Sequence, residues 1–358
     1  MNKETETVRL TQFSHGAGCG CKISPAILEE ILAGSLAMPD NKNLLVGNHT
    51  KDDAAVYDLG NGTALVSTTD FFMPIVDDPF DFGRIAAANA ISDVYAMGGK
   101  PLLAIAILGW PVNKIKADIA QRVINGGKSI CAEAGIPLAG GHSIDTPEPI
   151  FGLAVSGIVP IRNLKKNNSA GSGDYLFLTK KLGVGMLTTA EKRSKLLVEH
   201  QQLAARQMVQ LNNIGELLGA VDEVTAMTDV TGFGLGGHLV EMAESSGVTA
   251  ELYWNKIPLI TNLEYYIDNG IFPDGTKRNW SSYGHKISIP GQELKHASFT
   301  ILPDPQTNGG ILFSVKDSGL DKIHTLLSAN GLSAFAEPIG RMVPRENHVI
   351  RVVEANLV

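Results

Sequence analysis

The segment DFGRIAAANAISDVYAM (residues 81–97) decides the fold that we predict for this chain. Alanines and larger apolar residues surround it on nearly all sides, which is typical of a helix buried inside a protein. Asn89 and Asp93 lie four residues apart and therefore share one face of this helix. Burying a carboxylate is costly unless it is paired or binds a metal ion. We therefore expect Asp93 to have a functional partner.

The chain on either side of this helix reads as two α/β units. Gly98 and Gly99 end the helix, and a continuous apolar strand follows at 102–108, long enough to be central. A further helix is predicted at 115–134, and further strands at 55–57, 64–69, 136–139 and 151–159. Gly140 and Gly141 are expected to form a turn after the strand 136–139, directly before His142 and Ser143. The polar, turn-rich segment 162–173 is the predicted linker.

A second α/β pattern of strands and helices follows the linker, without an internal repeat. Strands are predicted at 174–179, 226–229 and 311–315, and helices at 182–191, 200–218, 235–244 and 320–329. Short strands with polar loops are expected over 249–290. We predict the α/β (α+β) class with an N-terminal segment 1–48, a first domain 49–161, the linker 162–173 and a second domain 174–358.

Composition limits the classes of function. The 358 residues are 44% hydrophobic and 19% charged, with a net charge of −7, which is typical of a globular protein. No lysine or arginine run predicts a nucleic-acid partner, and no apolar run approaches the roughly 20 residues that span a bilayer. Three cysteines make no disulfide framework, and the polar N-terminus is unlike a signal peptide. We expect a cytoplasmic protein that does not associate with a membrane.

The N-terminal segment SHGAGCGCK (residues 14–22) is predicted to be a flexible, reactive loop. Its glycines allow a ligand to approach the backbone closely. Lys22 lies three residues after Cys19, and a nearby cation favours the nucleophilic thiolate. Cys19 and Cys21 could bind a soft metal, form a redox pair, or supply a nucleophile that handles a chalcogen. Cys131, in an apolar helix, is expected to be an inert core thiol.

Aspartates recur at strand ends, glycine turns and the buried helix. They are Asp52, Asp53, Asp70, Asp93 and Asp229. A single aspartate in such a place is more often a cap or a turn residue. Five of them favour Mg²⁺, which commonly bridges carboxylates to substrate phosphates. Lys22 and Lys51 are placed to meet phosphates, although no P-loop motif is present.

Two glycine-rich turns complete the set of candidates. His142 follows Gly140 and Gly141, and this stretch with Ser143 could contact a ribose or a phosphate. A lone histidine is nevertheless more often structural than catalytic. Asn308-Gly309-Gly310 is a plausible turn and nothing more.

These motifs together resemble the selenide, water dikinases, or selenophosphate synthetases. The resemblance covers nearly the whole chain, through segments 14–22, 52–57, 67–74, 80–101, 139–143, 226–234 and 304–310. The loop with Cys19 and Lys22 is its specific part, whereas the aspartate segments are shared with the wider aminoimidazole-ribonucleotide synthetase-like superfamily. The resemblance implies that ATP, selenide and water give selenophosphate, AMP and orthophosphate. It also implies two α/β domains, an N-terminal sheet that pairs across a homodimer, and a long ATP cleft roofed by the mobile loop.

The resemblance also implies roles for individual residues. Cys19 is similar to the catalytic cysteine of the family and Lys22 to its essential lysine. Many members carry selenocysteine where this chain has Cys19, which makes the nucleophile here less acidic. The implied Mg²⁺ ligands are Asp53, Asp93 and Asp229. The implied nucleotide contacts are Lys22, Thr50, Lys51, Asp52, Asp70, Asp93, Gly141, His142 and Ser143.

The selenophosphate would serve selenocysteine and selenouridine synthesis, and a selenium-delivery protein is a further expected partner. Two rival interpretations remain at this point. Another superfamily member, a cyclo-ligase or small-molecule kinase, would reuse the aspartates and form ADP. A non-catalytic chalcogen or metal carrier would use the cysteines alone.

Overall fold

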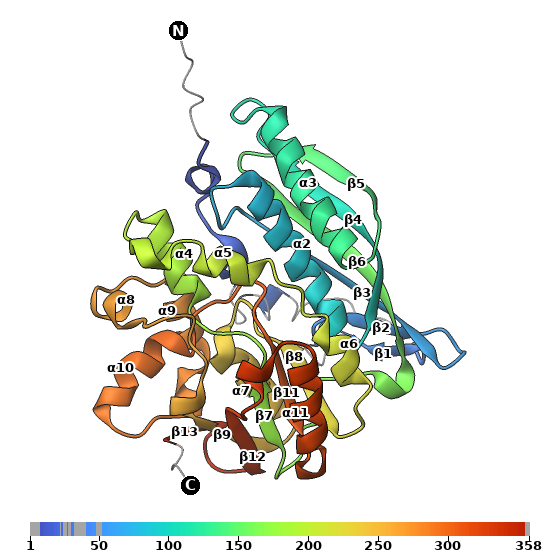
Figure 1. The fold of residues 1–358 in the computed structure, drawn as a ribbon, viewed down its shortest axis with the longest axis vertical. Coiled ribbons are helices and arrows are strands. Elements are labelled where there is room, and N and C mark those ends of the chain that lie inside the picture. Colours follow the sequence, from blue (N-terminus) through green and yellow to red (C-terminus); the bar gives the residue numbers. More distant parts are fainter. Residues whose placement is uncertain are drawn as a thin grey trace.

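The computed structural model describes residues 8–21, 23, 27, 30–31, 41–47 and 52–354. They form two mixed α/β units, each built on one β-sheet, with the helices packed against the sheets (Figure 1). This confirms the predicted fold class. In the described part of the chain, no helix combines the length and the apolar character needed to cross a membrane.

The first sheet has six strands in the order β1-β2-β3-β6-β4-β5. Its strands are β1 (Leu44–Val46), β2 (Ala55–Asp58), β3 (Thr63–Phe72), β4 (Lys100–Trp110), β5 (Leu138–Asp145) and β6 (Ile150–Pro160). Only β4 and β5 pair in parallel, joined by the crossover through α3 (Ala117–Glu133). The strand β5 forms the edge of the sheet beyond β4.

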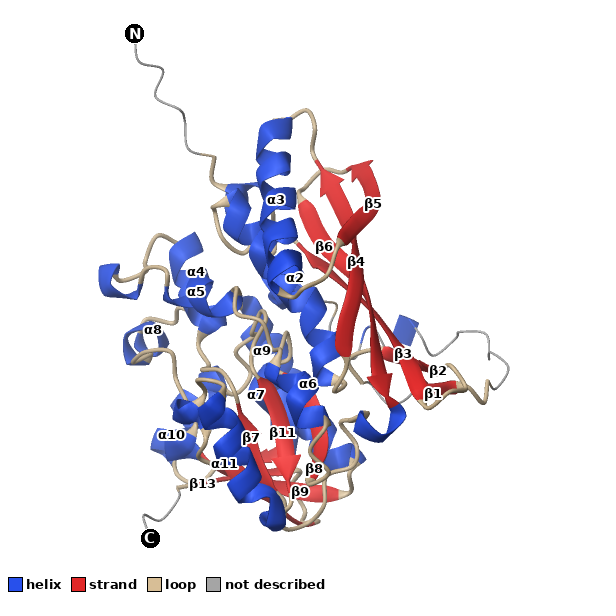
Figure 2. Ribbon diagram, turned by 45° about the vertical axis from the view of Figure 1, so that its right-hand side comes forward, coloured by secondary structure: helices blue, strands red, loops and turns tan. Residues whose placement is uncertain are grey.

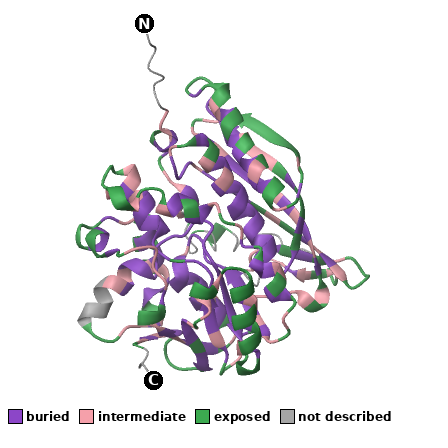
Figure 3. Ribbon diagram, viewed as in Figure 1, coloured by how far each residue is buried: buried purple, intermediate pink, exposed green. Residues whose placement is uncertain are grey.

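The helix α2 (Pro79–Ala96) is the buried centre of the molecule (Figure 3). It starts at the N-cap Asp78, whose side chain accepts a hydrogen bond from the Asp81 amide, with Pro79 in the first turn. Gly83 faces α3 so closely that a Cβ there would lie 1.9 Å from the Val123 carbonyl oxygen. The two helices therefore pack tightly together on one face of the first sheet (Figure 2).

The opposite face of the first sheet is uncovered in the single chain. Phe71 on β3, Leu103 and Ile105 on β4, and Ile144 on β5 are between 40% and 58% exposed. Large apolar side chains gathered on one sheet face indicate an interaction surface.

The second sheet has seven strands in the order β10-β13-β9-β12-β7-β11-β8. Its strands are β7 (Tyr175–Leu178), β8 (Val224–Asp229), β9 (Val248–Tyr253), β10 (Ile287–Ser288), β11 (Ile311–Val315), β12 (Gly340–Pro344) and β13 (Ile350–Val353). The helices of this half are α4 (Val184–Lys192), α5 (Leu203–Met208), α6 (Ile214–Gly219), α7 (Gly234–Ser245), α8 (Glu264–Asp268), α9 (Asp274–Tyr283), α10 (Gln292–Ile301) and α11 (Leu320–Ala329).

Short 3₁₀ turns lie between these elements: η1 (Leu10–Phe13), η2 (Gly18–Cys21), η4 (Ile161–Asn163), η5 (Val198–His200), η6 (Trp254–Lys256), η7 (Gly284–Lys286), η8 (Asp317–Gly319) and η9 (Ser333–Phe335). The helix α2 also contacts β8, α5 and α6 of the second half. Its far end thus lies at the junction of the two units.

Three predicted elements differ from the structure. The predicted turn at Gly140 and Gly141 is instead part of the strand β5, which runs unbroken through Asp145 and pairs with β4. The expected helix 200–218 is interrupted between α5 and α6, where the Asn308 and Asn212 side chains bind backbone groups. The region 249–290 contains the helices α8 and α9 besides its short strands.

Candidate active site

Three of the predicted metal ligands come together where the two units meet. Asp53 lies two residues before β2, Asp93 lies on α2, and Asp229 ends β8. Burial raises the pKa of Asp53 well above its usual value, and the charges of Asp229 and Asp93 raise it further. Among the described residues, no cation contributes to the electrostatics of this carboxylate.

We call Asp53, Asp93 and Asp229 the carboxylate cluster. Each of these carboxylates accepts a hydrogen bond from a hydroxyl group. Thr68 Oγ1 donates to Asp93 Oδ2 at 2.5 Å. Ser92 Oγ donates to Asp229 Oδ2 at 2.5 Å, and Thr228 Oγ1 donates to Asp53 Oδ1 at 2.9 Å. Two of these bonds cross between the units, since Ser92 lies on α2 and Thr228 on β8.

The cluster has the donor chemistry that Mg²⁺ prefers, because its ligands are all carboxylate oxygens. Asp53 Oδ2 is shielded from solvent and has no hydrogen-bond partner, and the same holds for Asp52 Oδ2. A buried carboxylate oxygen without a partner is expected where a cation binds. In the described ranges, no three Asp, Glu, His or Cys side chains already stand close enough to hold a metal ion.

The predicted nucleotide contacts Asp70 and Asp52 lie beside the cluster. Asp70 Oδ2 accepts a hydrogen bond from Asn89 Nδ2 at 2.7 Å, across from α2. Asp52 Oδ1 accepts from the Asn167 amide at 2.8 Å, which ties it to the segment between the units.

The turn at Asn308 supports this arrangement from the second unit. Its backbone has φ +49°, and its amide donates to Asn89 Oδ1 at 2.7 Å. The buried Lys180 donates to the Asn308 carbonyl at 2.9 Å. Burial lowers the pKa of Lys180 to about 7, while the charge of Asp229 opposes this shift. The turn therefore does more than reverse the chain, because it connects the second unit to Asp70 through Asn89.

The glycine loop, residues 14–21, contacts both units through its backbone. Lys192 Nζ on α4 donates to the carbonyls of Ser14 and Gly16, each at 3.1 Å. Arg278 Nη2 on α9 donates to the Gly20 carbonyl at 2.8 Å. In the first unit, the Gly18 amide donates to the Met73 carbonyl at 3.1 Å.

The structure describes only part of the predicted catalytic pair. Cys19 lies in η2, but its side chain is outside the described residues, as is that of Cys21. Lys22, Thr50 and Lys51 also lie outside the described residues. The roles predicted for these residues therefore stay predictions.

Gly141, His142 and Ser143 are not brought to the cluster within one chain. One row of paired residues crosses the strands β3, β6, β4 and β5. From strand to strand it consists of Phe71, Gly152, Ile107 and His142. Residues in such a row share one sheet face, so His142 is on the uncovered face. Asp70 precedes Phe71 and is on the other face, toward α2.

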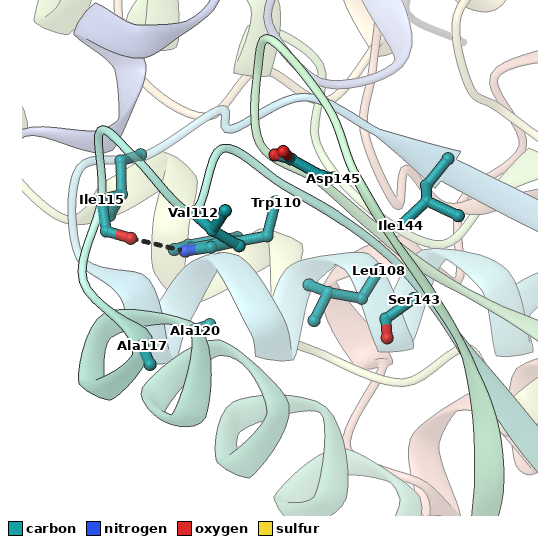
Figure 4. A pocket seen from close by; sticks show the side chains of 9 residues that line it. All are labelled: Leu108, Trp110, Val112, Ile115, Ala117, Ala120, Ser143, Ile144 and Asp145. Carbon is teal, nitrogen blue, oxygen red and sulfur yellow. Dashed lines mark hydrogen bonds between the residues drawn. The ribbon is translucent and has the colours of Figure 1, made fainter.

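A pocket of about 300 Å³ lies at the far end of β4 and β5, beside α3 (Figure 4). It is lined by Leu108, Trp110, Val112, Ile115, Ala117, Ala120, Ser143, Ile144 and Asp145. The Trp110 indole donates to the Ile115 carbonyl at 3.1 Å. The lining is mostly apolar and its charged group is acidic, so it does not suit a triphosphate.

Sequence reasoning missed the groups that hold the site together. They are the hydroxyls of Thr68, Ser92 and Thr228, the buried Lys180, and the loop contacts Lys192 and Arg278. Ser92 and Thr228 each directly precede a predicted metal ligand, which is a signal that the sequence does contain. Lys192 and Arg278 carry no local signal, because their partners are distant backbone carbonyls.

Comparison with known proteins agrees with this architecture. The family model for the N-terminal domain of AIR synthase related protein matches residues 51–159, and the model for its C-terminal domain matches residues 171–353. A selenide, water dikinase of Pseudomonas putida is 56% identical over 98% of this chain and 100% of its own length. The chain belongs to the selenide, water dikinase family. Another dikinase, from Colwellia psychrerythraea, is 57% identical over 94% of this chain and 96% of its own.

Solved structures of more distant proteins share the fold of this selenide, water dikinase family member. The hydrogenase maturation protein HypE in complex with ATP aligns with a TM-score of 0.63 at 18% identity, covering 98% of this chain and 95% of its own. At this identity the likeness concerns the fold alone.

Proposed function

We propose that this chain synthesises selenophosphate from ATP, selenide and water, releasing AMP and orthophosphate. The observation that carries the proposal is the identity of 56% to a curated selenide, water dikinase along nearly the whole length of both chains. ATP is the phosphoryl donor and selenium the acceptor of the γ-phosphoryl group. The product is the selenium donor for selenocysteine and selenouridine synthesis.

Asp53, Asp93 and Asp229 would hold Mg²⁺ on the triphosphate. Bound there, Mg²⁺ supplies charge neutralisation and alignment of the phosphates, which is most of what phosphoryl transfer requires. The three carboxylates come from both units, so their convergence also fixes one unit against the other. Asp52 and Asp70 flank them and would contact the nucleotide, together with Thr50 and Lys51.

The glycine loop would supply the chemistry at the γ-phosphate. In this proposal Lys22 binds phosphate and Cys19 delivers the selenide, which is already a good nucleophile and needs delivery more than activation. The loop contacts both units, so it can close over a nucleotide that lies between them. Closure would exclude water until selenium has been phosphorylated. The cytoplasmic compartment predicted from the sequence would keep this thiol reduced.

We also propose that the functional form is a homodimer. A second copy would cover the apolar face formed by Phe71, Leu103, Ile105 and Ile144, and it would bring a nucleotide near Gly141, His142 and Ser143. Ile105→Asp places a charge on this face and should give a monomer in analytical ultracentrifugation. Lys128→Asp, on the exposed surface of α3, is the matched control and should leave the mass unchanged. A dimeric Ile105→Asp protein would contradict the proposal.

The deciding experiment is anaerobic ³¹P NMR of the protein with ATP, Mg²⁺ and selenide. We expect a resonance with ⁷⁷Se coupling from a P–Se bond, together with AMP and orthophosphate in equal amounts. ADP as the sole nucleotide product would indicate a small-molecule kinase or a cyclo-ligase instead. A protein that consumes no ATP would be a carrier. Adding a selenium-delivery protein in place of free selenide is the next step with the same readout.

A further inference from the structure

The three hydroxyl groups of the carboxylate cluster form an ordered chain. Ser92 directly precedes Asp93 in the sequence, and Thr228 directly precedes Asp229. Neither hydroxyl donates to its own neighbour. Ser92 binds Asp229, the residue after Thr228, and Thr228 binds Asp53. Thr68 continues the chain by binding Asp93, the residue after Ser92. Each hydroxyl therefore binds a carboxylate on another element: β3 is bonded to α2, α2 to β8, and β8 to the residues before β2.

These bonds commit one oxygen of each carboxylate. The clearest case is Asp53, where Thr228 occupies Oδ1 while Oδ2 is buried and has no hydrogen-bond partner. A hydroxyl on one oxygen competes with a cation for that oxygen. At Asp53 it also fixes the plane of the carboxylate, so that Oδ2 is the oxygen presented to a cation.

One-oxygen coordination discriminates between divalent cations. Mg²⁺ takes six ligands in a strict octahedron at about 2.0–2.1 Å and commonly binds one oxygen of a carboxylate. Ca²⁺ takes roughly six to eight ligands at about 2.3–2.6 Å and often binds both oxygens of a carboxylate. Selectivity between them depends on ligand number and on the flexibility of the site.

We propose that the hydroxyls of Thr68, Ser92 and Thr228 are specificity-determining groups that hold the cluster aspartates to one-oxygen coordination and so favour Mg²⁺ over Ca²⁺. The inference rests on the proposed function, because it takes the cluster to be the metal site. A purely structural role would predict lost stability without a changed preference among cations.

The chain contains a matched control for this role. Thr225, on the same strand β8, donates to Asp174 Oδ2 at 2.5 Å. This bond has the same chemistry as the bond from Thr228 to Asp53, but Asp174 lies directly before β7 and is not part of the cluster. Thr225→Val therefore removes a comparable hydroxyl–carboxylate bond without touching the proposed metal site.

The test compares the full-length protein with Thr228→Val, Thr228→Ser and Thr225→Val. Binding of Mn²⁺ alone is followed by the EPR signal of the free ion, and bound Mn²⁺ is then displaced with Mg²⁺ or with Ca²⁺. The ratio of the two displacement constants reports selectivity without any catalytic turnover. We expect the preference for Mg²⁺ to fall about tenfold in Thr228→Val, a change equivalent to about 1.4 kcal/mol. Thr228→Ser and Thr225→Val should keep the wild-type ratio.

An unchanged ratio in Thr228→Val would overturn the inference while leaving the proposed metal site intact. A wild-type protein that binds no Mn²⁺ would overturn the metal site and the inference together. Should Thr228→Val fail to fold, Ser92→Ala tests the same claim at Asp229, because Ser92 donates to that carboxylate. A wild-type ratio in folded Ser92→Ala would equally contradict it.

Discussion

The carboxylate cluster and the glycine loop are held in place by different means. The cluster is held by short side chains on buried elements, with hydroxyl–carboxylate distances of 2.5–2.9 Å. The loop is held largely from outside, because its backbone carbonyls bind the long side chains of Lys192 and Arg278 at 2.8–3.1 Å. The Gly18 amide and the His15 side chain add contacts to the Met73 carbonyl and to Glu148. Short side chains from α2 and β8 lose little rotamer freedom when they bind, whereas long cations lose more.

This difference suggests a division of labour. A net hydrogen bond contributes only about 1 kcal/mol, so the few bonds that hold the glycine loop can be broken and remade within a catalytic cycle. The polar groups of the cluster lie between two packed units, and two of its hydrogen bonds join those units. Breaking these bonds would require the units to separate. In the proposed function, the metal site is permanent and the segment that carries Cys19 moves.

The largest expected effect concerns the chemistry of the loop. Cys19→Ser replaces a thiolate donor with a weakly acidic hydroxyl, so selenide-dependent AMP formation should fall by about 1,000-fold or more. ATP binding should be nearly unchanged, since the cluster is intact. Initial rates and binding of a non-hydrolysable ATP analogue measure the two quantities separately.

Cys131→Ala is the matched cysteine control for that experiment. Burial raises the pKa of the Cys131 thiol to about 11, so this thiol is unreactive and its loss should leave turnover unchanged. Full turnover in Cys19→Ser would remove the chemical role of the loop and leave the cluster as the whole site.

The same contrast explains what the sequence could predict. The buried helix 81–97 and its aspartate were predictable because alanine on all sides and a carboxylate at helical spacing are local signals. The convergence of Asp53, Asp93 and Asp229 was predicted only through family resemblance, because it depends on how two units pack. The side of the sheet that carries His142 could not be predicted, because the glycine pair 140–141 indicates a turn, and a turn directly before His142 does not fix which sheet face it occupies.

The anchoring of the loop gives the next expected effect. Lys192→Met removes both hydrogen bonds from Nζ to the carbonyls of Ser14 and Gly16. The loop should open more often, and protease cleavage between residues 16 and 20 should become about fivefold faster, as expected for a loss of about 1 kcal/mol. Cleavage rates are measured with and without a non-hydrolysable ATP analogue.

Lys195→Met is the control for Lys192→Met, because Lys195 lies just beyond the same helix α4 and is exposed. It should be cut at the wild-type rate. If Lys192→Met were also cut at the wild-type rate, the glycine loop would be held as firmly as the cluster, and the proposed division of labour would fail.

The remaining expected effect is on stability and concerns the segment between the two regions, residues 303–310. Gly20 of the glycine loop lies beside Pro305, and the Asn308 amide binds Asn89 near the cluster. Asp304 anchors this segment to the start of α4 by accepting the Gly185 amide at 3.1 Å. Burial raises the pKa of Asp304 from 3.8 to about 8, although hydrogen bonds from Gln306 and two amides oppose the shift.

A raised pKa in the folded state makes the native protein hold a proton that the unfolded chain releases above about pH 4. The contribution of Asp304 to stability is therefore fully present below pH 3.8 and is lost progressively as the pH rises to about 8. Asp304→Asn removes this titration, so the free energy of unfolding of the wild type should fall relative to the variant by about 1.4 kcal/mol per pH unit at most. Urea titrations from pH 5 to 8 measure it, with the exposed Asp317→Asn as control. Parallel curves for wild type and Asp304→Asn would mean that Asp304 stays ionised, and that the segment between loop and cluster is anchored by a charge at the start of α4.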